Sequence, residues 1–254
     1  MSVLRHYERK ALVPFEEDEY HEFKGHRSLA IEELPPWCYH PHSTRRSRKA
    51  ASRAIAAFLN SGRGGTVYLG IIDEGVVKGI YLTEFQKDHV LVSLKDLFSR
   101  YRPMVTEDKY EVTFVPVFEK DCPQNVLEPE LNLETAQKHL KAHLLRTYDF
   151  CWCDQELGTR IDNDEKTQDY VVEIKIHPQK GTFQVFDDSS FKAVLPVVYE
   201  NEEGKCFFRK SASCVEYTVE MVKELAREQI KDMYDPIIQS LRQQVNDVKQ
   251  LGVT

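Results

Sequence analysis

The sequence predicts an α+β fold, with a mixed or antiparallel sheet packed against helices. Segments in which apolar residues recur at helical spacing alternate with short runs rich in β-branched and aromatic residues. The 254-residue chain contains 41% hydrophobic and 30% charged residues, which is typical of a globular protein with a sizeable core. No stretch is long and apolar enough for a membrane span, so none is expected.

The chain divides into a lead-in at residues 1–11, one domain over residues 12–235 and a C-terminal helix over residues 236–254. Two stretches rich in proline or polar residues are expected to be surface insertions in that domain, at about residues 28–43 and 119–168. We therefore place the regular elements of the domain outside these insertions, except for one helix.

The first helix is expected over residues 44–61, after a cap at Ser43 or Thr44, because apolar side chains recur there at helical spacing. It also carries basic residues in its first turns and on the face opposite to the apolar side chains. A second helix is expected over residues 83–100, and a third near residues 133–148, inside the longer insertion.

The C-terminal part of the chain is expected to form two helices. The first covers about residues 215–233 and ends before Pro236, because proline disrupts a helix interior. The second contains a short apolar seam at the spacing of a coiled coil, made of Ile238, Leu241, Val245 and Val248.

The remaining regular runs predict strands. Residues 66–72 and 76–82 are expected to pair as a hairpin around the turn at residues 73–75, whose sequence is Asp-Glu-Gly. Further runs that alternate, or that are rich in β-branched and aromatic residues, lie at residues 110–118, 170–177, 195–199 and 206–213.

The net charge of −7 argues against general binding to polyanions. One segment of the chain, residues 41–72, is nevertheless strongly basic. Residues 41–72 contain neither aspartate nor glutamate. The cations of this segment are therefore candidates for contacting the phosphates of a nucleic acid: Arg45, Arg46, Arg48, Lys49, Arg53 and Arg63. The alternative is that this basic helix is only solvated, or that it pairs with the acidic stretch at residues 119–168.

The acidic segment EDEYHEFK, residues 17–24, precedes the basic one. Clustered carboxylates repel one another unless a cation neutralises them, and Mg²⁺ or Mn²⁺ takes such oxygen ligands. Glu17, Glu22 and Asp73 are therefore candidate ligands of a catalytic metal ion, with Lys24 as a clamp for a phosphate. From spacing alone, a solvated acidic turn explains these residues as well.

Several short motifs follow one another in order along the chain. They are E-x-x-x-x-E-F-K at residues 17–24, AFLNS at 57–61, Gly-Gly at 64–65, LGI at 69–71, the acidic turn at 73–75 and VVKG at 76–79. In this order they resemble the AlbA-type domain of the Schlafen family, and the later run CFFRKSAS resembles the closing strand of that domain. The length of one module is similar to that of Schlafen-like proteins, rather than of the long Schlafens with helicase-type extensions.

The resemblance implies a metal-dependent endoribonuclease. In nuclease-active Schlafens, two glutamates and an aspartate at these motif positions form the site, which here implies Glu17, Glu22 and Asp73, with Glu74 as an alternative to Asp73. Lys24 matches the motif lysine beside the scissile phosphate. The implied substrates are structured RNAs such as tRNA, or small-RNA precursors including piRNA precursors.

The resemblance also implies a second subunit. The nuclease unit of longer Schlafens has two AlbA-type lobes that face each other across an RNA channel, and this chain holds one such module. We therefore expect a homodimer, or a heterodimer with another Schlafen-like subunit, helped by the apolar seam near the C-terminus. Two alternatives stay open, a non-catalytic nucleic-acid-binding subunit of an RNA-processing complex and a protein-interaction scaffold.

Zinc is not expected from the sequence. Active Schlafens carry Cys and His zinc ligands after the second helix, where this chain has RYRPMVTEDKY. The zinc-like spacings are those of Cys38 with His40 and of Cys151 with Cys153, which would make a site only if the two insertions met. Six scattered cysteines, with an N-terminal stretch unlike a signal peptide, predict reduced thiols in a cytosolic or nuclear compartment, and we expect a cytoplasmic location.

Overall fold

The computed structural model describes residues 5–39, 48–120, 141–163, 168–179, 182–187 and 190–251. Within them, six strands form one sheet: β1 (Tyr7–Glu8), β2 (His21–Lys24), β3 (Gly65–Leu69), β4 (Ile80–Tyr81), β5 (Tyr110–Phe118) and β6 (Asp169–Ile176). The strand order is β1-β5-β6-β3-β2, with β4 beside β6. The sheet is mixed, because β1 runs parallel to β5 and β2 parallel to β3, whereas the pairs with β6 are antiparallel.

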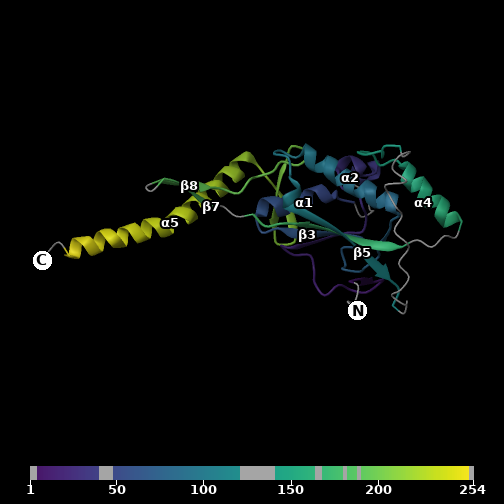
Figure 1. The fold of residues 1–254 in the computed structure, drawn as a ribbon, viewed down its shortest axis with the longest axis horizontal. Coiled ribbons are helices and arrows are strands. Elements are labelled where there is room, and N and C mark those ends of the chain that lie inside the picture. The colour runs from purple at the N-terminus through teal and green to yellow at the C-terminus, as the bar shows by residue number, and fades with distance from the viewer. Residues whose placement is uncertain are drawn as a thin grey trace.

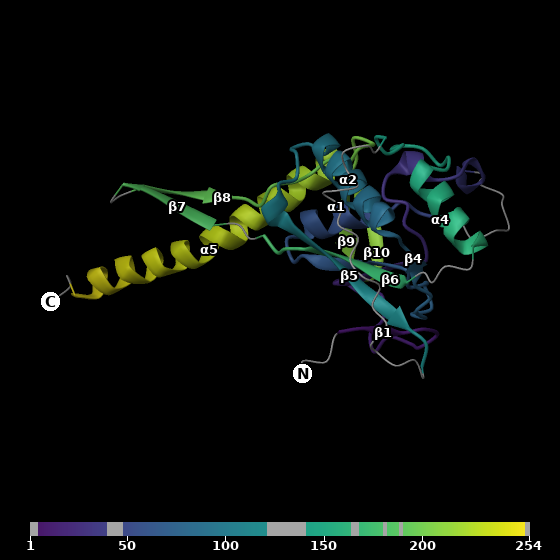
Figure 2. The ribbon, with the colours of Figure 1, turned by 45° about the vertical axis from the view of Figure 1, so that its right-hand side comes forward.

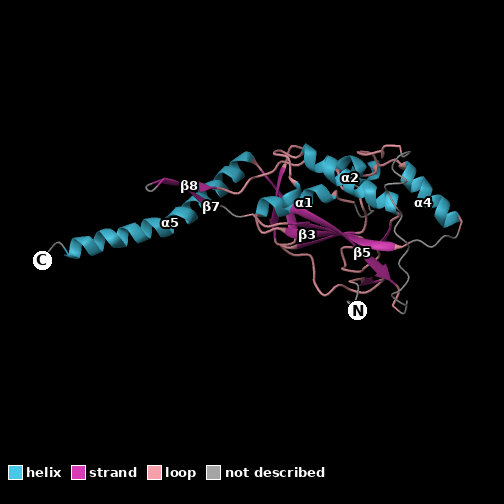
Figure 3. Ribbon diagram, viewed as in Figure 1, coloured by secondary structure: helices cyan, strands magenta, loops and turns pink. Residues whose placement is uncertain are grey.

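Two helices, α1 (Ala51–Ser61) and α2 (Glu84–Arg100), cover one face of this sheet (Figure 1). Phe58 of α1 and Leu94 of α2 belong to one buried cluster with Ile174 of β6. Figure 3 shows the helices of the body gathered on one side of the strands. The predicted α+β class is therefore confirmed.

The opposite face of the sheet buries a smaller cluster under the N-terminal residues. Phe23, Tyr68 and Val171 pack there, with Val13 and Phe15 lying against them. Strand β6 is thus covered on both faces where Val171 and Val172 point to opposite clusters. Its second half alternates, with Ile174 and Ile176 on the helix-covered face and the charged Glu173 and Lys175 alternating with them.

Two hairpins follow the sheet in the chain. β9 (Cys206–Lys210) and β10 (Ser213–Tyr217) pair antiparallel and pack against α1 (Figure 2). β7 (Thr182–Asp187) and β8 (Ser190–Val194) form the second hairpin, which the sequence analysis missed. Phe207 of β9 and Ser213 and Cys214 of β10 line a cavity described below.

The remaining elements lie at the two ends of the molecule. α4 (Trp152–Asp162) packs near α2, whereas α5 (Val219–Leu251) starts beside β10 and extends away from the body (Figures 1 and 2). The short 3₁₀ helices are η1 (Ile31–Glu33), η2 (Pro36–Tyr39) and η3 (Glu107–Lys109).

The first helix begins later than the sequence predicts, at Ala51 rather than residue 44. Residues 40–47 lie outside the described part of the chain, and residues 48–50 are not helical. The start is set by tertiary contacts, since the N–H groups of Ala51 and Ser52 donate to the carbonyls of Ser28 and Leu29, at 3.2 and 2.9 Å. These carbonyls satisfy helix-terminal donors that a side-chain cap would otherwise serve.

The expected hairpin around residues 73–75 is present only as a tight turn. One antiparallel bridge joins Ile71 to Val77, and the following strand β4 pairs with β6 instead of β3. Strand β3 is already occupied on both edges, by β2 and by β6. Gly79 turns the chain away towards β6 with a φ of +73°, which favours glycine. A side chain is also excluded there, because a Cβ atom at this position would lie only 2.9 Å from Asp169 Cβ.

Two elements expected from local pattern are absent from the described residues. Residues 141–148 are not helical, residues 133–140 lie outside the described part, and the helix of this region is α4. Residues 195–199 form no strand, because the backbone of Tyr199 is bonded by the side chain of Asn60: the Tyr199 N–H donates to Oδ1 at 2.7 Å, and Nδ2 donates to the Tyr199 carbonyl at 2.9 Å.

The C-terminal helix is single and continuous, so the predicted break before Pro236 is wrong. The helix also starts at Val219 rather than residue 215, because residues 215–217 pair with β9. Proline leaves one helix carbonyl without its N–H donor, but α5 stands largely exposed, so water can serve that carbonyl.

Candidate active site

Strand β2 places a carboxylate and an amine side by side. Successive side chains of a strand point to opposite faces, so Phe23 enters the core while Glu22 and Lys24 share the other face. Lys24 Nζ donates to Glu22 Oε1 and, at 2.9 Å, to the carbonyl of Phe23. Both charged side chains are about nine-tenths buried, with 10% and 9% of their surfaces exposed.

Arg209 of β9 holds the other oxygen of Glu22. Its guanidinium donates to Glu22 Oε2 and to the carbonyls of Asp18 and His21, at 2.8 and 2.7 Å. The side chain is 1% exposed and lies over the ring of Phe58, 5.0 Å from its centroid. Arg209 thus joins the β9–β10 hairpin to residues 18–22, which include Glu22.

Glu17 is brought back beside β2 by a backbone contact. Its Oε1 accepts the N–H of Phe23 at 2.8 Å, so residues 17–20 form a loop that folds onto the start of the strand. Burial raises the pKa of Glu17; the N–H of Phe23 and the charge of Lys24 act against this, and the charges of Glu22 and Asp73 add to it.

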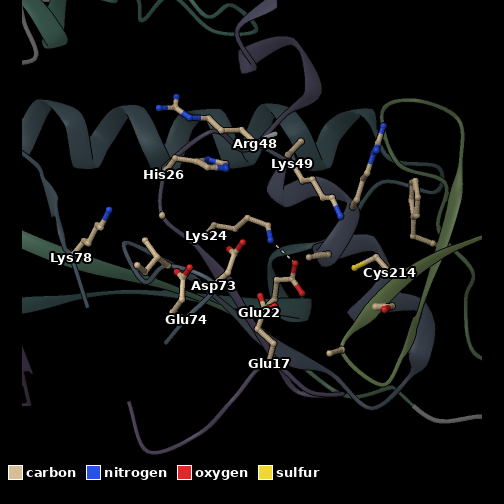
Figure 4. A pocket seen from close by; sticks show the side chains of 18 residues that line it. Glu17, Glu22, Lys24, His26, Arg48, Lys49, Asp73, Glu74, Lys78 and Cys214 are labelled. Atoms are coloured by element: carbon tan, nitrogen blue, oxygen red, sulfur yellow. Dashed lines mark hydrogen bonds and ion pairs between the residues drawn. The ribbon is translucent and has the colours of Figure 1, made fainter. Parts of the chain in front are cut away.

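Asp73 reaches the same place from the turn after β3. Gly75 closes this turn with φ of +76°, and its N–H donates to the carbonyl of Ile72 at 2.7 Å. Glu17, Glu22, Asp73 and Glu74 all line one cavity of about 620 Å³ (Figure 4). The three acids that the sequence singles out therefore face one space, together with the alternative Glu74.

Cations line the wall of this cavity that faces the acids. Lys24, Arg48 and Lys49 are among them, and Figure 4 shows Arg48 and Lys49 on the side of α1. The full set of cations in the lining is Lys24, Arg48, Lys49, Arg53 and Lys78. The cavity thus combines clustered carboxylates with a cationic wall.

The six predicted phosphate-contacting cations are not equivalent. Arg48 and Lys49 are exposed at the cavity, whereas Arg53 is held by two bonds of 2.8 Å to the carboxylate of Glu203. Arg63 pairs with Glu19 and does not line the cavity. The remaining two, Arg45 and Arg46, lie outside the described residues.

The carboxylates of Glu17, Glu22 and Asp73 do not lie close enough together to form a complete set of metal ligands. Among the described residues, one group of His, Cys, Asp or Glu has all its ligand atoms within 4.8 Å of one another, and it does not include the acids of this cavity. The cause is that Glu22 is turned to Lys24 and Arg209, which neutralise it. Mg²⁺ commonly takes few carboxylates and several waters, so it does not require a closed set of protein ligands.

The closed group is a cluster of two histidines and two cysteines near α2 and α4: His89, His143, Cys151 and Cys153. His89 Nδ1 lies 3.3 Å from Cys153 Sγ, and His143 Nδ1 lies 3.6 Å from Cys151 Sγ. Tetrahedral zinc with nitrogen and sulfur ligands requires separations of about 3.5 to 4 Å between these atoms. The donor set and its spacing fit a zinc ion.

Groups around this cluster support metal binding. Asp88 Oδ2 lies 3.0 Å from His143 Nε2, an arrangement that orients the imidazole with Nδ1 towards Cys151. The N–H of Leu144 donates to Cys151 Sγ at 3.2 Å. Burial lowers the pKa of His89 to about 4, which favours the neutral imidazole. Burial also raises the pKa of Cys153 to about 12, so this thiol is protonated unless a metal ion displaces its proton.

This set differs from the one that the sequence suggested. Cys151 and Cys153 are present in it, but Cys38 is not, and His40 lies outside the described residues. The two histidines come from α2 and from the loop before α4, more than fifty residues apart in the chain. Sequence spacing gives no signal for such a pairing, although the isolated C-x-C motif marks half of it.

Comparison with protein-family models identifies the domain. Residues 17–130 match the model described as Schlafen, AlbA_2. The chain contains a Schlafen AlbA_2 domain. The match begins at Glu17, covers β2, α1, β3, the turn at Asp73, α2 and β5, and supports a function related to nucleic acids. No described helix is long and apolar enough to cross a membrane.

Arg209 lies beyond the matched segment, and the sequence analysis did not assign it to the site. It stands within CFFRKSAS, the run whose resemblance to the closing strand of Schlafen domains was the available signal. The structure adds what the motif could not give, namely that this arginine bonds the carboxylate of Glu22.

Proposed function

We propose that this Schlafen domain is a metal-dependent endoribonuclease. Its substrates would be structured or precursor RNAs, such as tRNA or small-RNA precursors including piRNA precursors. The observation that carries the proposal is the single cavity in which Glu17, Glu22 and Asp73 face Lys24, Arg48 and Lys49. A cluster of acids alone would favour the binding of a metal cation, and a cluster of cations alone would favour the binding of a phosphate. Hydrolysis of a phosphodiester by a metal-dependent enzyme uses both kinds of group.

The cations of the chain would position the RNA. Arg48 and Lys49 are exposed at the cavity wall, where they can hold backbone phosphates without reading sequence. Lys24 is almost buried and fixed by the Phe23 carbonyl, so its ammonium group can contact one phosphate at the acids with little loss of conformational entropy.

The donor chemistry of the cavity fits Mg²⁺ or Mn²⁺, which take carboxylate oxygens. Glu17, Glu22 and Asp73 would hold such an ion, which would supply an activated water and stabilise the leaving oxygen. Arg209 and the N–H of Phe23 keep Glu22 and Glu17 in place before any ligand arrives. The protein therefore supplies a fixed set of acids rather than a flexible acidic loop.

The two acids of the turn provide a matched test of this proposal. Asp73→Asn is expected to reduce the single-turnover rate of RNA cleavage by about a hundredfold or more, because it removes one anionic ligand. Glu74→Gln, which alters the next side chain of the same turn, is expected to leave the rate close to that of the wild type. Cleavage of labelled tRNA with Mn²⁺ measures both. Wild-type rates in both variants would remove the turn from the site.

The cationic wall is tested by the salt dependence of RNA binding. Each of Arg48→Ala and Lys49→Ala is expected to weaken binding for all sequences alike, and to lower the slope of log K against log salt by about 0.7 to 1. Lys95→Ala is the control, because Lys95 is exposed, lies outside the cavity and pairs with Glu107. Fluorescence anisotropy at several salt concentrations gives the slopes; slopes equal to that of Lys95→Ala would exclude phosphate contacts at residues 48 and 49.

We further propose that two chains associate, as a homodimer or with another Schlafen-like subunit. Support comes from α5, where Ile238, Leu241, Val245 and Val248 are 41–68% exposed at coiled-coil spacing. Leu241→Asp is expected to shift sedimentation towards the monomer, whereas Ser240→Asp places the same charge off the seam and should not. A wild-type monomer at tens of micromolar, with and without RNA, would contradict the homodimer.

A second candidate function is a non-catalytic RNA-binding subunit. One observation favours it: both oxygens of Glu22 are bonded by protein cations, so this carboxylate is neutralised without a metal ion. In that case RNA binding would survive Glu22→Gln, and no divalent ion would produce cleavage.

A cytoplasmic site of action agrees with the described cysteines, none of which forms a disulfide.

A further inference from the structure

A second cavity of about 490 Å³ adjoins the first. Gly25, His26 and Arg48 line both, so the two cavities meet at these residues. The far wall of the second cavity is made by α2 and by residues 144–150, the loop between two members of the His/Cys cluster.

Exposed aromatic side chains stand around this second cavity. Phe150 is 80% exposed, Tyr148 55% and Tyr81 47%, and all three line it. Large apolar rings are costly to leave in water, and here three of them gather beside one opening. Flat exposed rings are surfaces on which unpaired bases stack. The charged lining of this cavity is mixed, since Arg27 pairs with Asp154 and Arg48 is the arginine that it shares with the acidic cavity.

Buried polar atoms of the same cavity have no hydrogen-bond partner among the described residues. They are the hydroxyl of Ser93, a residue that is 5% exposed, and one terminal nitrogen of Arg27. An unsatisfied buried donor lowers stability, so such atoms point to a ligand that supplies an acceptor. Nucleobases and ribose carry acceptors next to a flat apolar face, which suits both features together.

We propose that the second cavity binds an unpaired nucleotide of the substrate, adjacent to the phosphate held in the acidic cavity, with its base stacked on Phe150 and Tyr148. This inference rests on the proposed nuclease function, and it narrows the substrate to RNA with single-stranded nucleotides beside the cut. The phosphate side of the nucleotide meets Arg48, which lines both cavities, and the base side meets the rings. Fully paired RNA would not fill the second cavity.

The test measures binding apart from cleavage. Full-length protein carrying Asp73→Asn, in EDTA, is titrated with a short oligoadenylate, with a duplex of the same length, and with a ribose-phosphate oligomer that lacks bases. Phe150→Ala in this background is expected to weaken oligoadenylate binding by about tenfold and to leave the other two probes unchanged, because only an unpaired base can stack. Phe150→Trp is expected to restore binding, which a purely structural role of Phe150 would not predict.

Met104→Ala serves as the control, since Met104 is 59% exposed and lines neither cavity. Equal binding of oligoadenylate by Phe150→Ala and Met104→Ala, at unchanged melting temperature, would overturn the inference, as would an equal loss for all three probes. The two proposals fail separately. Base-dependent binding without cleavage in any metal would refute the nuclease, whereas cleavage unaffected by Phe150→Ala on single-stranded RNA would refute the stacking site.

Discussion

Arg209→Met is expected to lower the free energy of unfolding by about 3–5 kcal/mol. The substitution removes one of the two cations that pair with the almost buried carboxylate of Glu22, leaving Lys24, and it removes the three bonds that join β9 to residues 18–22. Methionine keeps the contact with Phe58, so the loss reports the charge and the hydrogen bonds rather than a cavity. Urea unfolding, followed by circular dichroism, measures it.

Two further variants separate the causes. Arg209→Lys keeps a positive charge but cannot bond Glu22 and the two carbonyls at once, so it is expected to fall between wild type and Arg209→Met. In a double-mutant cycle, Glu22→Gln with Arg209→Met should cost about 0.5 to 3 kcal/mol less than the sum of the single changes. Strict additivity would mean that the two side chains do not depend on each other.

The purified protein is expected to contain one tightly bound zinc ion per chain, held by His89, His143, Cys151 and Cys153. Cys153→Ser should abolish the zinc content and lower the melting temperature strongly, because metal binding at a structural site contributes directly to folding. Elemental mass spectrometry and a thermal melt, each with and without a zinc chelator, provide the measurements.

Cys38→Ser is the informative control for zinc, because sequence spacing offers Cys38 as a ligand only if the two insertions meet, and the cluster in the structure does not include it. It should retain the metal and the melting temperature. Loss of zinc in Cys38→Ser, or its retention in Cys153→Ser, would contradict the assignment. The same ligands hold residues 144–150 at both ends, so zinc removal is also expected to weaken binding of oligoadenylate at Phe150.

The sequence predicts those parts of the fold that have local causes. α2 is an example, because a capping box of Thr83 and Gln86 starts it and its apolar stripe has helical spacing. β5 follows the predicted bounds for the same kind of reason. The Schlafen-like motifs also predict the acids Glu17, Glu22 and Asp73 of the candidate site, which line one cavity in the structure.

Long-range contacts decide the features that the sequence could not give. α1 starts where the carbonyls of Ser28 and Leu29 receive its first N–H groups, and Asn60 takes the place of a strand partner for Tyr199. Arg53 belongs to the basic face that the sequence predicts, yet in the structure its guanidinium donates two hydrogen bonds to Glu203, which is far away in the sequence. Such pairings depend on tertiary structure, so composition and spacing carry no signal for them.

Cleavage of RNA tests the central claim most directly. Purified protein is incubated with a labelled tRNA and a labelled single-stranded RNA in Mn²⁺, Mg²⁺ or EDTA, beside a Glu17→Ala/Glu22→Ala variant whose folding is verified by its melting curve. We expect cleavage by the wild type with Mn²⁺ or Mg²⁺, none in EDTA, and none by the folded variant. Cleavage that persists in the variant or in EDTA, or RNA binding by the wild-type protein without cleavage in either metal, would contradict a metal-dependent nuclease at this site.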